Sequence, residues 1–252
     1  MTRIRRWTIT STLLLLWLIV PAHFMVSAAT DSDGAPYMIC IDPGHPSEVG
    51  SGTQGRHITE IEAAWRMAQA LKAELTARGM NVVLTKQKEH EFVRNRRRAE
   101  IANESHADYM VRLHCDADAG TGIASYAPDR QGSIDGVTGP SKEVIKASRR
   151  MGAAFHRAMI KSLAGKLRDR GFLPDTKTAV GRKHHALIGS IYTKVPVVLV
   201  EMCVLTNPAD EKFIRDPKNQ ISLAKAMADG VEAALAAKTS DIDATTRVKL
   251  KD

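Results

Sequence analysis

The stretch YMICIDPGHPSEVGSGTQGRHITEIE, residues 37–62, decides the fold class because one short run holds a strand, a glycine-rich loop and the start of a helix. The apolar segment 37–41 predicts a buried strand, and Asp-Pro-Gly at 42–44 marks its end. Over residues 61–75, apolar side chains recur at the spacing of one helical face, and Gly79 marks the end of that helix. A strand followed in this way by a helix is the repeating unit of an α/β fold.

The same alternation of apolar strands and amphipathic helices continues to residue 237. Strands joined by right-handed helical crossovers pair in parallel and carry helices on both sides. We therefore predict a single α/β domain with a largely parallel, twisted sheet of about six strands and helices on both faces. The sequence favours further strands at 80–85, 107–117, 121–127 and 195–205, and helices at 91–106, 141–171, 207–214 and 219–237.

Titratable side chains fall where three of these strands end. His45 follows the first strand, His114 ends the third and Glu201 ends the last apolar run, while Glu60 opens the first helix. Ligands of such sheets bind beyond the carboxyl ends of the strands, so these side chains are expected to converge. Because imidazoles and carboxylates are typical ligands of catalytic zinc, we predict that His45, Glu60 and His114 bind Zn²⁺.

Glu201 is predicted to act on the water beside that zinc ion. A carboxylate at the end of an apolar run is costly to bury unless it has a partner or a role, and a general base is one such role. Each residue also has a plainer interpretation. His45 could be a solvated turn residue, Glu60 a first-turn acid, His114 a hydrogen-bonded core residue and Glu201 an ion-pair partner of Arg112.

The first 29 residues have the pattern of an export signal. Three arginines precede an apolar core at 13–20, and small residues at 27–29 suit a signal peptidase. The uncharged run 7–30 is also long enough to span a bilayer, so a cleaved signal peptide and a retained membrane anchor both remain open. Either alternative places the remaining chain outside the cytoplasm, in the periplasm or the extracellular cell wall.

The net charge favours an anionic partner. The 252-residue chain carries a formal charge of +8, and the three arginines of the leader leave +5 for the rest, which fits a cell wall or membrane surface. The densest basic cluster, 94–98, is interpreted as a solvated helix face; no aromatic residues interleave with it, so nucleic-acid binding is not predicted. Cys40, Cys115 and Cys203 are too few and too far apart for a disulfide framework, and we expect buried thiols.

Four blocks of the chain read ICIDPGH (39–45), TEIEAAWRMAQALKAEL (59–75), YMVRLHCDA (109–117) and VPVVLVEMCVLTNPADEKFI (195–214). In this order and spacing, they resemble the zinc-dependent N-acetylmuramoyl-L-alanine amidases, the amidase-3 family. The resemblance covers about residues 37–237 and implies zinc held by His45, Glu60 and His114, with Glu201 as the catalytic base. Within HITEIE, it selects Glu60 over Glu62 as the ligand.

The third block reads RLHCD where the family has a pattern close to SIHAN. Because side chains alternate along a strand, Arg112 shares a face with His114. Two interpretations stay open: Arg112 contacts a substrate carboxylate or Glu201, or it is an ordinary solvated residue at the sheet edge. The same alternation turns the side chain of Cys115 away from the site and places Cys203 on the same side of its strand as Glu201. The segment between residues 122 and 201 has the length of family members without an inserted plugging helix, so we expect an open site.

These inferences predict an exported zinc hydrolase that cuts the amide bond between N-acetylmuramic acid and L-alanine in peptidoglycan. The identity of the bond rests on the resemblance, since the residues alone indicate metal-assisted amide hydrolysis. The alternatives are an exported zinc peptidase acting on soluble peptides and a non-catalytic wall-binding module; any regulatory partner is undefined. The predicted organisation is a signal peptide or anchor at 1–29, a spacer at 30–36, a catalytic domain at 37–237 and a polar, frayed tail at 238–252.

Overall fold

The computed structural model describes residue 30 and residues 34–249, so the predicted leader lies outside the described residues. No helix among the described residues has the length and apolar character needed to cross a membrane. The elements are β1 (Met38–Pro43), α1 (Glu60–Ala77), β2 (Asn81–Leu84), α2 (Asn95–Glu104), β3 (Tyr109–Asp116), β4 (Ile123–Ala127), β5 (Gly132–Ile134), β6 (Val137–Gly139), α3 (Lys142–Leu163), β7 (Asp169–Pro174), the 3₁₀ helix η1 (Asp175–Lys177), α4 (Ala179–His184), α5 (Ile188–Tyr192), β8 (Val197–Val204), α6 (Pro208–Arg215) and α7 (Pro217–Lys249).

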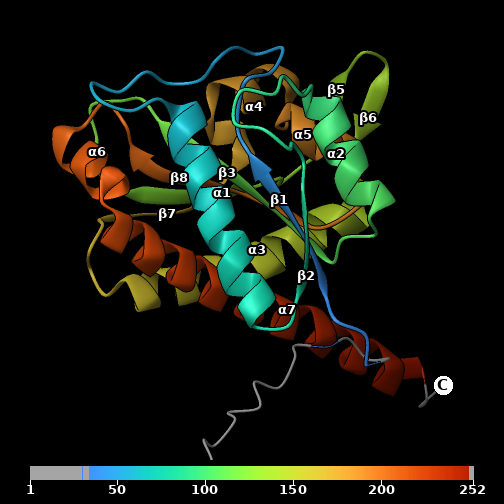
Figure 1. Cartoon of the computed structure of the whole chain (residues 1–252). Helices are drawn as coiled ribbons and strands as arrows, with labels where there is room; N and C mark the ends of the chain where they lie inside the picture. Colours follow the sequence, from blue (N-terminus) through green and yellow to red (C-terminus); the bar gives the residue numbers. More distant parts are fainter. Residues whose placement is uncertain (1–29, 31–33, 250–252) are drawn as a thin grey trace, which may run out of the picture.

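Six strands form one sheet in the order β2-β1-β3-β8-β4-β7, and β5 and β6 form a separate hairpin (Figure 1). The strands β2, β1, β3 and β8 run parallel, β4 runs antiparallel to β8, and β7 runs parallel to β4. The prediction of a largely parallel, six-stranded sheet is therefore confirmed.

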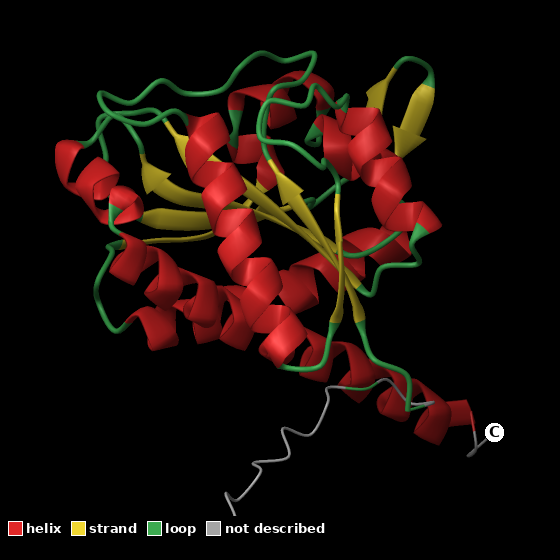
Figure 2. Ribbon diagram, viewed as in Figure 1, coloured by secondary structure: helices red, strands yellow, loops and turns green. Residues whose placement is uncertain are grey.

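Helices cover both faces of the sheet, as predicted (Figure 2). On one face, α1, α3 and α7 pack together and against the sheet, and they enclose the main apolar core. On the other face, α2 lies over β1 and contacts α5, and smaller apolar clusters fill the space beneath them. The helices α1 and α2, which follow β1 and β2 in the chain, thus lie on opposite faces of the sheet. This arrangement leaves a crevice at the carboxyl ends of β1 and β3.

Two parts of the chain differ from the prediction. Residues 169–174, placed partly within a predicted helix, form the edge strand β7, because the chain turns at Ala164 and Gly165, both in the left-handed region. The carboxyl-terminal helix α7 continues to Lys249, so the segment expected to be a frayed tail from residue 238 begins as helix. Lys238 within it forms a 2.5 Å ion pair with Asp108.

Candidate metal centre

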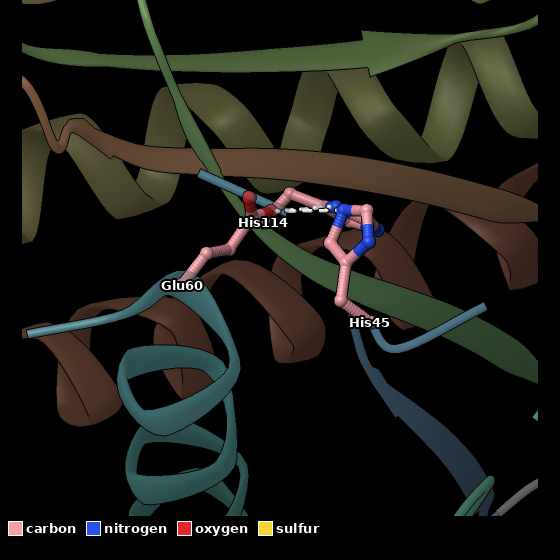
Figure 3. A group of neighbouring side chains, drawn as sticks. All are labelled: His45, Glu60 and His114. Carbon is pink, nitrogen blue, oxygen red and sulfur yellow. Dashed lines mark hydrogen bonds and ion pairs between the residues drawn. The ribbon is translucent and has the colours of Figure 1, made fainter. Parts of the chain in front are cut away.

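His45, Glu60 and His114 meet beyond the carboxyl ends of β1 and β3 (Figure 3). One ligand atom of each residue lies within 4.8 Å of the other two. His45 lies two residues beyond the end of β1, Glu60 is the first residue of α1, and His114 lies near the end of β3. The structure therefore brings together the three residues that the sequence predicted as ligands.

Both imidazoles approach the same oxygen of Glu60. His114 Nδ1 lies 2.9 Å from Glu60 Oε1, and His45 Nε2 lies 3.5 Å from it. The other nitrogen of His45, Nδ1, lies 2.9 Å from the carbonyl oxygen of Gly50, so Nδ1 carries the proton and the lone pair of Nε2 points toward the site. A carbonyl partner of this kind orients a metal-binding histidine.

The electrostatics of the three side chains suit a cation. Burial alone would raise the pKa of Glu60, but the hydrogen bond and charge of His114, with His45 and the Thr53 amide, hold it below its usual range. Burial lowers the pKa of His114, which favours the neutral imidazole that a metal requires. Its Nε2 is buried without a hydrogen-bond partner among the described residues. Two imidazoles and a carboxylate form a donor set that fits zinc.

The loop that carries His45 to Glu60 passes very close to the ligands. A Cβ atom on Gly52, whose φ is +77°, would lie 2.6 Å from Glu60 Oε2 and 2.7 Å from the ring of His45. A Cβ atom on Gly44 would lie 2.5 Å from the ring of His114. Only glycine fits these two positions. The next loop residue, Thr53, donates its amide to Glu60 Oε2 at 2.7 Å.

Buried cations hold the His45 turn (residues 43–46) in place, and sequence reasoning missed them. Arg98 donates to Asp42 Oδ1 at 2.7 Å and to the carbonyl oxygens of Pro43 and Pro46 at 2.6 and 3.1 Å. Lys86 donates to the carbonyl oxygen of His45 at 2.6 Å. These bonds support a backbone that places His45 at a φ of +53°, which is unfavourable for a residue with a Cβ atom.

Glu201 lies in the wall of the same cavity, which has a volume of about 480 Å³ and is also lined by the three candidate ligands. It pairs in register with His114 on the adjacent strand. Its Oε2 is buried without a hydrogen-bond partner among the described residues. Burial, together with the carboxylates of Glu60 and Asp116, raises the pKa of Glu201 well above its usual value. A buried carboxylate with one oxygen unpaired among the described residues, beside a candidate metal site, has the character of a proton acceptor.

The arrangement of ligands, loop and buried glutamate has counterparts in known proteins. The family model described as Amidase_3, N-acetylmuramoyl-L-alanine amidase, matches residues 39–233. The chain belongs to the Amidase_3 family.

Two curated relatives carry amidase names. The N-acetylmuramoyl-L-alanine amidase CwlM of Bacillus licheniformis is 29% identical over 168 residues, or 61% of this chain and 63% of the relative. The N-acetylmuramoyl-L-alanine amidase AmiC of Neisseria meningitidis serogroup B is 25% identical over 227 residues, or 79% of this chain and 53% of the relative. This Amidase_3 chain thus spans between half and two thirds of the length of these relatives.

Solved structures confirm the Amidase_3 fold. The catalytic domain of CwlV, an N-acetylmuramoyl-L-alanine amidase from Bacillus (Paenibacillus) polymyxa var. colistinus, superposes with a TM-score of 0.63 at 22% identity. That comparison covers 80% of this chain and 99% of CwlV. Ami1 from Mycobacterium smegmatis gives a TM-score of 0.64 at 19% identity, over 79% of this chain and 97% of Ami1.

In this Amidase_3 chain the hydrogen bonds of Arg112 go to residues other than Glu201, and its predicted contact with a substrate stays a prediction. It lines the cavity, but only 3% of its surface is exposed, and its Nε donates to Asp42 Oδ2 at 2.8 Å. Its Nη2 donates to Asn95 Oδ1 at 2.7 Å. Asp42 and Asn95 are therefore the hydrogen-bond partners of Arg112, and Glu201 is not. Sequence reasoning missed Asp42 because it was interpreted only as part of a turn.

Two other acidic residues have structural roles in the Amidase_3 fold. Glu62 lies two residues beyond Glu60 on α1 and pairs with Arg66 on the surface of the helix. Glu48, on the glycine-rich loop, accepts a hydrogen bond from the backbone amide of Asn95 at 3.0 Å and so caps α2. The N-cap residue of α2, Arg94, makes no side-chain hydrogen bond to the end of the helix. Neither carboxylate is a candidate ligand.

The three cysteines are free and buried, as predicted. Cys203, however, does not face the site as its parity with Glu201 indicated. The register between β3 and β8 shifts after the pair His114–Glu201, so that Met202 and Cys203 both turn into the main core. There Cys203 meets Cys115.

Proposed function

We propose that this chain hydrolyses the amide bond between N-acetylmuramic acid and L-alanine in peptidoglycan, using zinc. The observation that carries the proposal is the convergence of His45, Glu60 and His114 within 4.8 Å, in a chain of the Amidase_3 family. The buried carboxylate of Glu201 in the same cavity, whose Oε2 has no hydrogen-bond partner among the described residues, adds a proton acceptor. The amidase names of two curated relatives support the identity of the bond.

His45, Glu60 and His114 would hold the zinc ion, which when bound acts as a Lewis acid on the amide carbonyl and acidifies the attacking water. Glu201 then accepts the proton of that water and delivers it to the nitrogen of L-alanine as the C–N bond breaks. The Thr53 amide holds Glu60 in position and Gly52 leaves room for its carboxylate, while Lys86 and Arg98 fix the turn that carries His45.

Arg112 is proposed to contribute positive charge to the cavity wall rather than a flexible substrate contact. Its guanidinium is fixed by Asp42 and Asn95, and it lies in the wall shared by His114 and Glu201. A fixed guanidinium can stabilise a substrate carboxylate or carbonyl oxygen that enters the cavity without moving to meet it.

We also propose that the catalytic domain, residues 37–237, works outside the cytoplasm after export by the first 29 residues. Peptidoglycan lies in that compartment, and the leader has the charge and apolar pattern of a signal peptide or anchor. Residues 30–36 would then link the leader to the domain.

The decisive experiment is digestion of purified sacculi with and without a metal chelator, with the products identified by mass. The proposal expects stem peptides with a free L-alanine amino terminus, their loss on chelation and their return with added zinc. The peptidase alternative instead expects cleavage only between amino acids of the stem or its cross-bridges. A non-catalytic wall-binding module would bind sacculi and release nothing.

A further inference from the structure

Two buried thiols touch beside the candidate metal centre. Sγ of Cys203 lies 3.7 Å from Sγ of Cys115, and both cysteines are free. Cys115 lies on β3, one residue beyond His114. Cys203 lies on the neighbouring strand β8, two residues beyond Glu201. Cys40, the remaining cysteine, is fully buried in a different apolar cluster with Met110 and Val197.

The backbone of the two strands permits a covalent bond between these thiols. Between the paired positions His114–Glu201 and Asp116–Val204, β3 has one residue and β8 has two, so the bulge turns Cys203 toward Cys115. Neighbouring strands are about 4.8 Å apart, within the range of roughly 4.4–6.8 Å between Cα atoms that a disulfide spans. The sulfurs need to approach each other by only roughly 1.7 Å to reach bonding distance.

Cys115 is also connected to the candidate metal centre. It is one of the residues that line the cavity that contains the ligands, while its side chain packs in the main core and only 3% of the residue is exposed. Its amide donates to Glu60 Oε1 at 3.1 Å, and its carbonyl oxygen accepts from Thr53 Oγ1 at 3.3 Å. A shift of the Cys115 backbone therefore acts directly on the carboxylate of Glu60.

We propose that Cys115 and Cys203 are a redox-active pair, which a low-molecular-weight disulfide converts into an intrachain disulfide that weakens metal binding. The sulfur of Cys115 attacks one sulfur of the co-reactant, and the other leaves as a thiol with one proton. The sulfur of Cys203 then attacks Sγ of Cys115 and displaces the second thiol with the second proton. Two electrons pass from the protein to the co-reactant.

The effect on the metal follows from the hydrogen bond of Cys115 to Glu60. Loss of a partner that orients a ligand typically lowers metal affinity by about 10- to 100-fold. We therefore expect the disulfide form to bind zinc at least about tenfold more weakly than the reduced form. This second part rests on the metal centre of the proposed function; formation of the disulfide does not.

The test treats the full chain with oxidised glutathione in two arms, one native and one refolding from the reduced, denatured chain. Thiols are counted after denaturation, and the digested protein is mapped by mass. We expect the count to fall from three to one, with a cross-linked peptide that joins the segments of Cys115 and Cys203. Three free thiols in both arms, or a disulfide that includes Cys40, would overturn the proposal.

Two variants provide controls. Cys40→Ala should lose both of its remaining thiols under the same treatment. The double variant Cys115→Ala/Cys203→Ala keeps the amide that holds Glu60 but cannot form the disulfide, so its zinc affinity should not respond to the oxidant. Equal zinc affinities of the two wild-type forms would overturn the link to the metal. A chain that forms the disulfide and binds zinc but leaves sacculi intact would refute only the proposed hydrolysis.

Discussion

The guanidinium of Arg98 and the carboxylate of Asp42 lie 2.7 Å apart beneath the His45 turn, and at most 1% of either side chain is exposed. Burial alone would raise the pKa of Asp42, but Arg98 and Arg112 hold it well below its usual range. A single ion pair thus joins the end of β1 to α2 and fixes the turn that presents a candidate metal ligand.

Replacement of Arg98 by methionine should destabilise the protein strongly. The substitution leaves the buried carboxylate of Asp42 with one guanidinium fewer and frees the carbonyl groups of Pro43 and Pro46, a loss of about 3–5 kcal/mol. Urea unfolding measures this difference. Arg97→Met, on the exposed face of the same helix, should change stability by no more than about 0.5 kcal/mol. Equal effects of the two substitutions would contradict the role given to Arg98.

Glu201→Gln should abolish hydrolysis of sacculi without removing the metal. The amide keeps the size of the side chain but cannot accept the proton of water, and loss of a general base costs about 10²- to 10⁴-fold in rate. Product release is followed by chromatography, and bound zinc by elemental mass spectrometry. Glu62→Gln, on the surface of α1, should retain full activity. A Glu201→Gln protein with wild-type activity would exclude this residue as the base.

Gly52→Ala should weaken zinc binding because its Cβ atom would enter the space of Glu60 and His45. Gly136→Ala is a matched control. Its φ of +74° is close to the +77° of Gly52, so both substitutions impose similar backbone strain, but Gly136 has open space around its Cβ position. Zinc titration should show a loss of about tenfold or more for Gly52→Ala alone. Similar losses in both variants would assign the effect to the backbone and not to the ligands.

Asp175 should make stability depend on pH. Its carboxyl group is fully buried, and burial raises its pKa to about 6, although the Leu187 amide donates to Oδ2 at 3.0 Å. Because the folded state favours the protonated form, this group contributes stability below about pH 4 and loses it as pH rises through 6. A shift of this size corresponds to about 3 kcal/mol.

The Asp175→Asn variant lacks this titration, so the stability of the wild type relative to the variant should fall between pH 4 and pH 7. Urea unfolding at intervals across this range measures the difference, and effects of other groups cancel. Asp135→Asn, at an exposed turn position, should track the wild type at every pH. A constant difference between wild type and Asp175→Asn would show that Asp175 is already ionised throughout the range.

The central strands and the three ligands were predictable because they produce local signals. The apolar runs that became β1 and β8 are continuous, that of β3 is interrupted only by Arg112, and each has a titratable residue at its carboxyl end. In contrast, β7 reads DRGFLP and has no strand pattern of its own. Its conformation is set by pairing with β4, a tertiary contact that local sequence does not record.

The buried polar network was hidden for a different reason. Asn95, Arg98, Ala99 and Ala102 form one buried stripe at helical spacing on α2, but two of its members are polar, so the cluster resembled a solvated face. That interpretation holds for the exposed Arg96 and Arg97 and is wrong for Arg98. The orientation predicted for the side chain of Cys203 was wrong because strict alternation along a strand does not anticipate a β-bulge.

The reversed direction of β4 has a consequence for anyone who wishes to re-engineer this protein. Because β4 runs antiparallel to β8 and starts at the level of Glu201, the short connection 117–122 stays at the rim of the cavity instead of crossing to the far edge. The side chains of Asp118 and Arg170 anchor it there. Exchange of this connection for longer segments offers a way to change the substrate range while the ligands and the core remain untouched.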